Sequence, residues 1–362
     1  MPTLLDLFSG CGGLALGSKN AGFTTSLAVD IDPILSSSFP VNFPTTKFLH
    51  ADVGVLTQST LHEYLPSGVD GIVGGPPCQA FSGIGKRLPD DPRRSLVGEF
   101  FRLVQEIQPA FFIMENVPGL AFPENRPILD EGLARLGSEW HVLGPVLLDA
   151  SHYGAPTRRK RVFVFGFNPK KMQVPTLDQI IATDAPQVCV KDAIADLVSA
   201  FQSSNDPSLW HYGAYPMASP YALRMRTPNG LFTGHQRTTH RPETIRRFST
   251  VPQGGVDQVG KHKRLAWDGL CPTLRAGTGS DRGSYQSVRP LHPDENRVIT
   301  PREAARLQGF PDSFIFNPTI WHSFRMIGNS VSPIIAEALL RNIRPFLPPD
   351  IKTTKRKNAA IA

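Results

Sequence analysis

The sequence predicts an α/β fold in which a mostly parallel, Rossmann-like sheet has helices on both faces, together with a smaller loop-rich region. Three observations lead to this prediction. Short apolar runs alternate with helical stretches over residues 1–167, several runs end in a glycine turn or an acid, and the alternation disappears between about 168 and 296. Regular structure is expected again over 297–347, and a disordered tail over 348–362.

Composition sets the broad class of the protein. The chain has 362 residues, 40% of them hydrophobic, which allows one large domain and a second smaller one. Its four cysteines have neither disulfide-scaffold density nor Cys-x-x-Cys spacing, so we expect a reducing compartment and no structural metal. We find no basic leader with a cleavage site, and no apolar run approaching the roughly 20 residues that span a bilayer. These features predict a cytoplasmic protein without a membrane partner.

Positive charge is concentrated in one part of the loop-rich region. The formal net charge of +7 is modest for this length, but residues 224–264 contain nine Lys or Arg and two acids, with three histidines between them. Solvated charge runs normally mix both signs, so this excess favours contact with the phosphates of a nucleic acid.

The first strand, over residues 3–8, is followed by a glycine turn at Gly10 and Gly12 and then by a helix. Glycines let the backbone turn tightly and approach a ligand, and the helix start offers free N–H groups. A second strand ends in Asp30, 20 residues beyond Gly10, where dinucleotide-binding folds place the acid that accepts from ribose hydroxyls. A nucleoside-containing cofactor is therefore expected. From this unit alone, a nicotinamide oxidoreductase and a methyltransferase are nearly equal alternatives.

Two further strand ends carry polar groups. A strand near Phe48 ends beside Asp52, which is suited to accept from an adenine amino group. The apolar run 70–74 is stopped by two glycines and two prolines, which present Cys78 on a stiff loop. A thiol at a strand's carboxyl end, where open α/β sheets build their sites, predicts a nucleophile rather than a core cysteine. The following segment, 83–95, has the Gly, Pro, Lys and Arg content of a mobile lid.

Glu115 follows an apolar strand directly. Its partial desolvation predicts a raised pKa, which suits a group that holds or delivers a proton. In one parallel sheet, the strand ends that bear Cys78 and Glu115 would face the same crevice. Further along, strand alternation places Arg159 and Arg161 on the same side, where they can meet one ligand together.

The C-terminal part begins with a capping box, in which Thr300 is the N-cap and Glu303 lies three residues beyond it. The predicted helix continues to about Gln308. The segment 328–333 then predicts a turn, followed by an amphipathic helix that ends near Arg344.

These blocks together resemble the cytosine-5 methyltransferases of DNA. The resemblance implies the fold of class I S-adenosylmethionine-dependent methyltransferases, with a catalytic and cofactor-binding domain over 1–167, a target-recognition domain over 168–296, and a C-terminal part over 297–347 that returns to the catalytic domain. The motifs, in the family's usual order, are 6–17 (DLFSGCGGLALG), 74–82 (GGPPCQAFS), 115–117 (ENV), 158–163 (RRKRVF), 297–308 (RVITPREAARLQ) and 328–331 (GNSV).

The resemblance also implies roles for individual residues. Four are implied to be catalytic: Cys78 as nucleophile, Glu115 at the N3 and amino edge of cytosine, Arg161 at its O2, and Arg159 in support. Those implied to line S-adenosylmethionine are Phe8, Gly10, Gly12, Leu14, Asp30, Ile31, Asp52, Val53, Pro77, Asn329 and Val331. Those implied to contact DNA are Gln79, Ser82, Lys86, Arg93, Thr273, Leu274 and Arg275. The chain departs from the family pattern at Asp30, often Glu, and at Thr157, usually Gln.

The implied activity is methyl transfer to C5 of cytosine in a specific sequence of double-stranded DNA, through addition of Cys78 to C6 of a flipped-out base. Two alternatives within the family are an RNA cytosine-5 methyltransferase and a catalytically silent DNA-binding relative. The Cys-Phe-Thr stretch of the tRNA-methylating relative is absent here, and the implied catalytic residues are present. We expect a monomer that is associated with the nucleoid through DNA. Whether a restriction endonuclease acts alongside it is left open.

Overall fold

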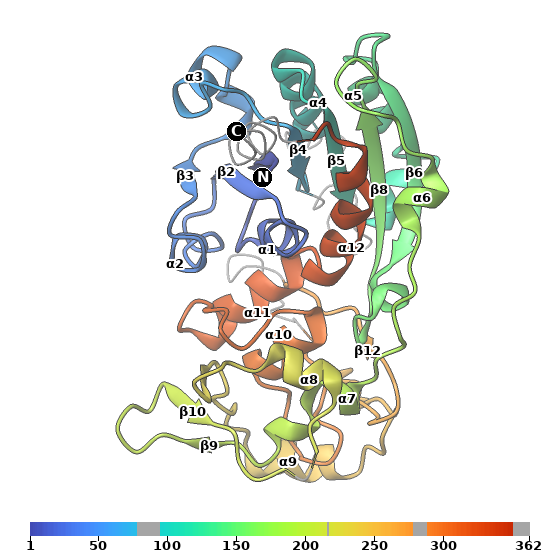
Figure 1. Cartoon of the computed structure of the whole chain (residues 1–362). Helices are drawn as coiled ribbons and strands as arrows, with labels where there is room; N and C mark the ends of the chain where they lie inside the picture. The colour runs from blue at the N-terminus through green and yellow to red at the C-terminus, as the bar shows by residue number, and fades with distance from the viewer. Residues whose placement is uncertain (78–94, 216, 278–287, 350–362) are drawn as a thin grey trace.

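A seven-stranded sheet forms the centre of the catalytic half, in the order β3-β2-β1-β4-β5-β8-β6 (Figure 1). The computed structural model describes residues 1–77, 95–215, 217–277 and 288–349. The first five strands run parallel, whereas β8 lies antiparallel between β5 and β6. The strands are β1 (Thr3–Leu7), β2 (Thr24–Asp30), β3 (Lys47–His50), β4 (Gly71–Gly74), β5 (Phe111–Asn116), β6 (His141–Asp149) and β8 (Lys160–Phe167). The predicted mostly parallel α/β fold is confirmed.

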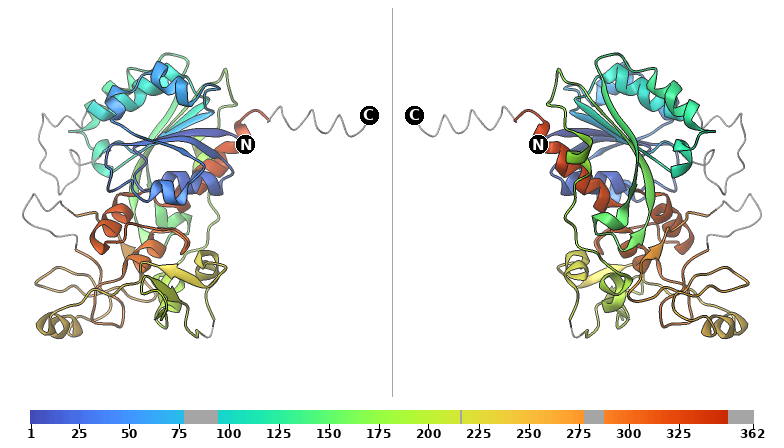
Figure 2. Two further views of the ribbon diagram at one scale, coloured as in Figure 1. Left: turned by 90° about the vertical axis from the view of Figure 1, so that its left-hand side faces the viewer. Right: turned by 90° about the vertical axis from the view of Figure 1, so that its right-hand side faces the viewer.

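Alternating side chains give each face of the sheet its own apolar layer, covered by helices (Figure 2). Ile72 and Phe112 belong to the layer that includes α4, whereas Val73 and Ile113 belong to the layer that includes α12. The first face carries α3 (Gln58–Tyr64), α4 (Ser95–Ile107) and α5 (Arg126–Leu133), and the second carries α1 (Gly13–Asn20), α6 (Leu177–Ile181) and α12 (Pro333–Ile343). Among the described helices, none has the length and apolar composition needed to cross a membrane.

Short elements joined by long connections lie beyond the sheet, at the lower end of Figure 1. Strands β9 to β11 form a small antiparallel sheet, and β12 pairs in parallel with β7 (Thr157–Arg158) at the end of the catalytic half. The bounds are α7 (Val190–Ile194), β9 (Phe201–Gln202), β10 (Leu209–His211), α8 (Pro220–Met225), β11 (Leu231–Thr233), α9 (Pro242–Ser249) and β12 (Cys271–Pro272). This is the loop-rich part that the sequence predicts.

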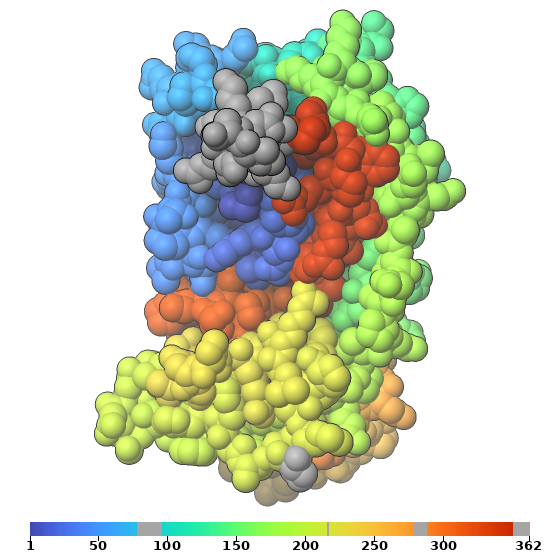
Figure 3. All heavy atoms as spheres, viewed as in Figure 1, coloured from blue at the N-terminus to red at the C-terminus, as the bar shows by residue number. Residues whose placement is uncertain are grey.

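The C-terminal helices α10 and α11 lie between these two parts (Figure 1), and the surface continues from this layer into the loop-rich part on the face shown in Figure 3. Helix α10 (Pro301–Gln308) begins with the predicted capping box: the Thr300 N–H donates to Glu303 Oε2 at 2.7 Å, and the Glu303 N–H donates to Thr300 Oγ1 at 3.2 Å. Helix α11 (Ile320–Asn329) was not predicted, and it includes Gly328 and Asn329, which the sequence assigned to the turn 328–333. The predicted turn is therefore wrong at these two residues, because glycine and asparagine are typical of turns but here form the last residues of a helix. A short helix, α2 (Phe39–Asn42), packs beside α11 and completes this layer.

A buried charge network fixes α10 to the loop-rich part. The fully buried guanidinium of Arg306 contacts Asp196 Oδ1 at 2.6 Å and Asp312 Oδ2 at 2.5 Å. Tyr212, from the end of β10, donates its hydroxyl to the same Asp312 at 2.6 Å. Because each buried charge has a partner at hydrogen-bond distance, the network holds α10 in one position relative to the segments around it.

We predict that Arg306→Met lowers the free energy of unfolding by about 3–5 kcal/mol, since the substitution removes the buried cation that Asp196 and Asp312 share. Urea unfolding followed by circular dichroism measures the change. Arg126→Ala is the matched control, because the Arg126–Asp130 pair is exposed and its loss should cost less than about 0.5 kcal/mol. Equal losses in the two variants would contradict the assignment.

Candidate active site

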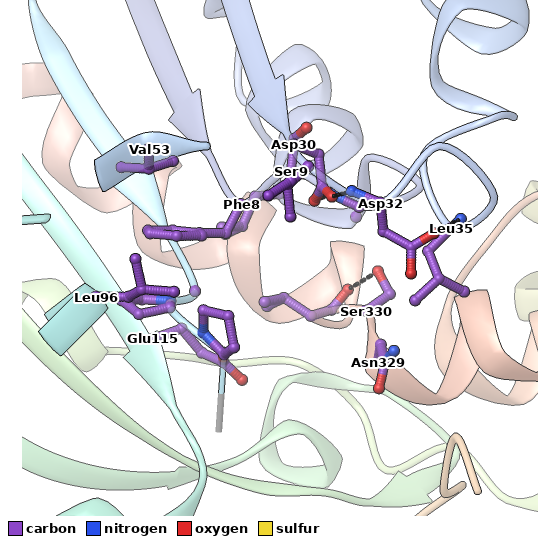
Figure 4. A pocket seen from close by; sticks show the side chains of 18 of the residues that line it. Phe8, Ser9, Asp30, Asp32, Leu35, Val53, Leu96, Glu115, Asn329 and Ser330 are labelled. Carbon is purple, nitrogen blue, oxygen red and sulfur yellow. Dashed lines mark hydrogen bonds between the residues drawn. The ribbon is translucent and has the colours of Figure 1, made fainter. Parts of the chain in front are cut away.

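A cavity of about 810 Å³ lies at the carboxyl ends of β1, β2, β4 and β5 (Figure 4). Open α/β sheets bind their ligands at this edge, because the strand ends and the loops that follow them converge there. Ten of the eleven residues implied to line the cofactor are on its wall: Phe8, Gly10, Leu14, Asp30, Ile31, Asp52, Val53, Pro77, Asn329 and Val331. Gly12 is the exception.

The turn after β1 presents bare backbone to the cavity. Phe8 adopts a left-handed conformation with φ of 58°, which is uncommon for a residue with a bulky side chain. Gly10 also has a positive φ, and a Cβ built on it would have no atom of the described residues within 4 Å, apart from those of its chain neighbours. The space beside Gly10 is therefore available to a ligand that approaches the backbone closely.

Asp30, at the end of β2, is fixed by the glycine turn. Its carboxylate accepts from the Gly10 N–H at 2.7 Å and from the Asp32 N–H at 2.8 Å. Burial raises the pKa of Asp30, while these two donors oppose the increase. Asp52, after β3, similarly accepts from the Gly54 N–H at 2.8 Å. Both acids are thus held in fixed orientations on the cavity wall.

Gly12 and Gly13 are neighbours in the glycine motif, but the structure gives them different roles. A Cβ on Gly12, whose φ is 99°, would lie 2.4 Å from the ring of Phe43, so glycine is needed there for packing rather than for lining the cavity. A Cβ on Gly13 would lie 2.0 Å from Ser330 Oγ. Glycine at that position lets α1 begin directly against the turn 328–331, which closes the cavity.

Several cavity residues were not found from the sequence. They are Ser9, Cys11, Asp32, Leu35, Leu96, Glu99, Met326 and Ser330. Ser330 lies inside a motif that the sequence singled out, so its position was an available signal. Leu96 and Glu99 come from the first turns of α4, and Leu35 from the connection after β2, and no local pattern marks these positions as ligand-facing.

The opposite wall of the cavity carries a buried ion pair. Glu115, which is 8% exposed at the end of β5, accepts from Arg161 Nε at 2.9 Å. Burial raises the pKa of Glu115, and the charges of Arg161 and Arg159 partly oppose this increase. The raised pKa agrees with the expectation from the sequence. The carboxyl group is therefore suited to hold a proton beside a ligand.

The chain leads toward Cys78 along this wall. Gly75, Pro76 and Pro77 line the cavity, and the Asn116 side chain donates to the Pro76 carbonyl at 3.2 Å. Cys78 itself lies outside the described residues, as do Gln79, Ser82, Lys86, Arg93 and the segment expected to act as a lid, apart from Ser95.

The remaining predicted residues do not line the cavity. Arg159 is 1% exposed and is not on the cavity wall; it donates to the carbonyls of Leu274, Gly328 and Ser330. Thr273 and Arg275 are exposed, whereas the side chain of Leu274 is 4% exposed. Of the three adjacent residues implied to contact DNA, two therefore present their side chains at the surface.

We predict that Arg161→Gln raises the pKa of Glu115 further, because the substitution removes the cation that favours the ionised carboxylate. Titration of the carboxyl carbon of Glu115 by NMR measures the change. Arg126→Gln, at an exposed ion pair on α5, should leave the pKa of Glu115 unaltered. A lowered or unchanged pKa in Arg161→Gln would show that the ion pair does not control this carboxyl group.

Comparison with known proteins identifies the family. Residues 3–344 match the family model for C-5 cytosine-specific DNA methylases. Type II methyltransferase M.XorII of Xanthomonas oryzae pv. oryzae is 39% identical, over 93% of this chain and 83% of the relative, and M.DdeI of Desulfomicrobium norvegicum is 31% identical, over 94% and 88%.

Solved structures agree with this result. A prophage-encoded DNA modification methyltransferase from E. coli superposes with a TM-score of 0.82 at 36% identity, covering 96% of this chain and 99% of that one. The Dnmt2 methyltransferase of S. pombe, at 17% identity, shares the fold with a TM-score of 0.63 over 95% and 99% of the two chains. The chain described here therefore belongs to the family of C-5 cytosine-specific DNA methylases and is a DNA cytosine methyltransferase.

Proposed function

We propose that this enzyme uses S-adenosylmethionine to methylate C5 of cytosine within one specific sequence of double-stranded DNA. One observation carries the proposal: a single cavity joins two acids suited to a nucleoside, Asp30 and Asp52, to the buried pair Glu115–Arg161. The first wall fits the methyl donor, and the second fits a pyrimidine ring whose N3 and O2 need a proton donor and a cation.

The residues present fit S-adenosylmethionine. Asp30 would accept from the ribose hydroxyls and Asp52 from the adenine amino group, while Phe8 and Ile31 offer apolar surface to the adenine. The open space beside Gly10 would admit the methionine part close to the backbone. When bound, this cofactor supplies a methyl group on a positively charged sulfur, which is the electrophile that the reaction requires.

The protein's own groups would make C5 of cytosine reactive. The Cys78 thiolate adds to C6, and the electron pair displaced from the ring is stabilised at N3, where Glu115 delivers its proton. Arg161 holds the O2 edge. After methylation, a base removes the C5 proton, the bond between Cys78 and C6 breaks, and the proton at N3 returns to Glu115. These steps regenerate the thiolate and the protonated carboxyl group. The raised pKa of Glu115 supports its assignment as the proton donor.

Specificity would come from the loop-rich region, residues 168–296, acting as a target-recognition domain that reads the bases of the duplex, while the target cytosine is flipped out into the cavity. The basic excess in residues 224–264 supports phosphate contacts there. The two curated relatives described above are type II methyltransferases, which supports a role in restriction–modification, with a separate endonuclease as the functional counterpart. We propose a monomer that acts in the compartment of its DNA substrate.

The direct test is transfer of labelled methyl from S-adenosylmethionine to unmethylated duplex DNA, with tRNA as the parallel substrate and base-resolution mapping of the product. We predict label at C5 of cytosine in one short motif, and at least a 10³-fold loss of turnover in Cys78→Ser with cofactor affinity retained. Label confined to tRNA would reject the DNA substrate, and full activity of Cys78→Ser would reject the nucleophile.

A second prediction concerns the cofactor wall. Asp30→Asn replaces one carboxylate oxygen by an amide donor that faces existing N–H donors, so affinity for S-adenosylmethionine should fall by roughly tenfold to a hundredfold. Isothermal titration calorimetry measures the dissociation constant. Asp130→Asn, on the exposed surface of α5, is the control. Equal affinity in Asp30→Asn and wild type would place the ribose elsewhere.

A further inference from the structure

We propose that Arg159 is a positioning residue that couples binding of the methyl donor to binding of DNA. Its buried guanidinium holds two segments at once. One is the DNA-side segment, residues 273–277, and the other is the cofactor-side turn, residues 328–331, which consists of the last two residues of α11 and the two residues that follow it. The inference rests on the proposed function in assigning DNA to the first segment and the methyl donor to the second.

The DNA-side segment is anchored to the residues that precede β8. Strand β12 pairs with β7, and the Thr273 hydroxyl donates to the Arg158 carbonyl at 2.6 Å. Arg159 Nη1 then donates to the Leu274 carbonyl at 3.3 Å. The exposed residues Thr273 and Arg275 thus belong to a backbone segment that is held in place by its bonds to Arg158 and Arg159.

The cofactor-side turn is held by the other end of the same guanidinium. Arg159 Nη2 donates to the Gly328 carbonyl at 2.9 Å and to the Ser330 carbonyl at 2.7 Å. These two carbonyls belong to the residues on either side of Asn329, which lies on the cavity wall. The Gln308 side chain also donates to the Ser330 carbonyl, at 3.0 Å, so the position of this turn depends on two side chains from different elements.

The two segments are also in direct contact. A Cβ on Gly328 would lie 2.5 Å from the backbone nitrogen of Ala276 and 2.6 Å from the carbonyl carbon of Arg275. The two backbones are therefore too close for any side chain to fit between them at this position. A displacement of one segment therefore moves a carbonyl that Arg159 binds, and the guanidinium transmits the displacement to the other segment.

Arginine is suited to this role because its planar group directs several N–H donors in fixed directions and remains charged when buried. Lysine has all three of its donors on one nitrogen, so it cannot place separate nitrogens against the DNA-side segment and the cofactor-side turn. The backbone of Arg159 is fixed independently, since its N–H donates to Asp149 Oδ1 at 3.0 Å and its carbonyl accepts from Ala150 at 3.0 Å. Changing the side chain should therefore leave β8 in place.

The expected consequence is reciprocal coupling. If a bound cofactor analogue orders the turn, the DNA-side segment is ordered at the same time, and DNA binds more tightly. By linkage, DNA must increase the affinity for the analogue by the same factor. Loss of the guanidinium should reduce the factor by which each ligand increases the affinity for the other. It should have a smaller effect on the affinity for either ligand alone.

The experiment measures dissociation constants for S-adenosylhomocysteine and for a duplex containing the mapped target site, each with and without the other ligand. In wild type we expect roughly tenfold mutual enhancement, equal in both directions. Arg159→Lys and Arg159→Gln should reduce the enhancement to less than about threefold. Arg158→Lys, at the neighbouring exposed side chain, should retain it, and thermal unfolding checks that each variant is folded.

Gly328→Ala provides a second test that keeps Arg159 intact. It separates the two segments and should also reduce the enhancement. The coupling would be rejected if the folded Arg159 variants kept the full mutual enhancement of affinity. It would also be rejected if wild type bound both ligands without any mutual enhancement. Neither result would contradict the proposed function. A wild type that binds neither ligand would reject the proposed function itself.

Discussion

The structure depends on one close contact, between the start of α1 and the turn 328–331. Gly13 permits this contact, because any side chain there would collide with Ser330. Helix α12 continues from the turn and packs along α1, where Gly17 lies directly against Ala336. The contact joins residues more than 300 positions apart and supplies the cavity with its last wall. The glycine motif is therefore as important for closing the site as for admitting a ligand.

The direction of β8 explains how the second wall is formed. Because β8 runs antiparallel to β5, its first residues lie beside the last residues of β5, and Arg161 meets Glu115 at the sheet edge where the parallel strands end. A parallel strand at this place would start at the opposite edge. The reversed strand therefore provides the cation beside the buried carboxyl group of Glu115. Arg159, which directly precedes β8, connects the strand to the carbonyls of Leu274, Gly328 and Ser330.

The sequence predicted the features that depend on local pattern. Strand ends identified Asp30, Asp52 and Glu115, and the capping box identified the start of α10. The sequence could not assign residues whose role depends on distant partners. Gly12 and Gly13 are equivalent in the motif, and their neighbours Phe43 and Ser330 distinguish them only after folding. Likewise, α4 residues on the cavity wall carry no local signature, and alternation alone did not show that Arg159 points to carbonyls from the C-terminal part.

We propose that one cavity serves both the methyl donor and a covalently activated cytosine. Duplex DNA carrying 5-fluorocytosine at the target position provides a direct test, since fluorine at C5 blocks the proton removal that would release the enzyme. We expect a stable protein–DNA adduct that requires S-adenosylmethionine and maps by peptide mass spectrometry to Cys78. An adduct at another residue, or no adduct with an enzyme that methylates ordinary cytosine, would contradict it.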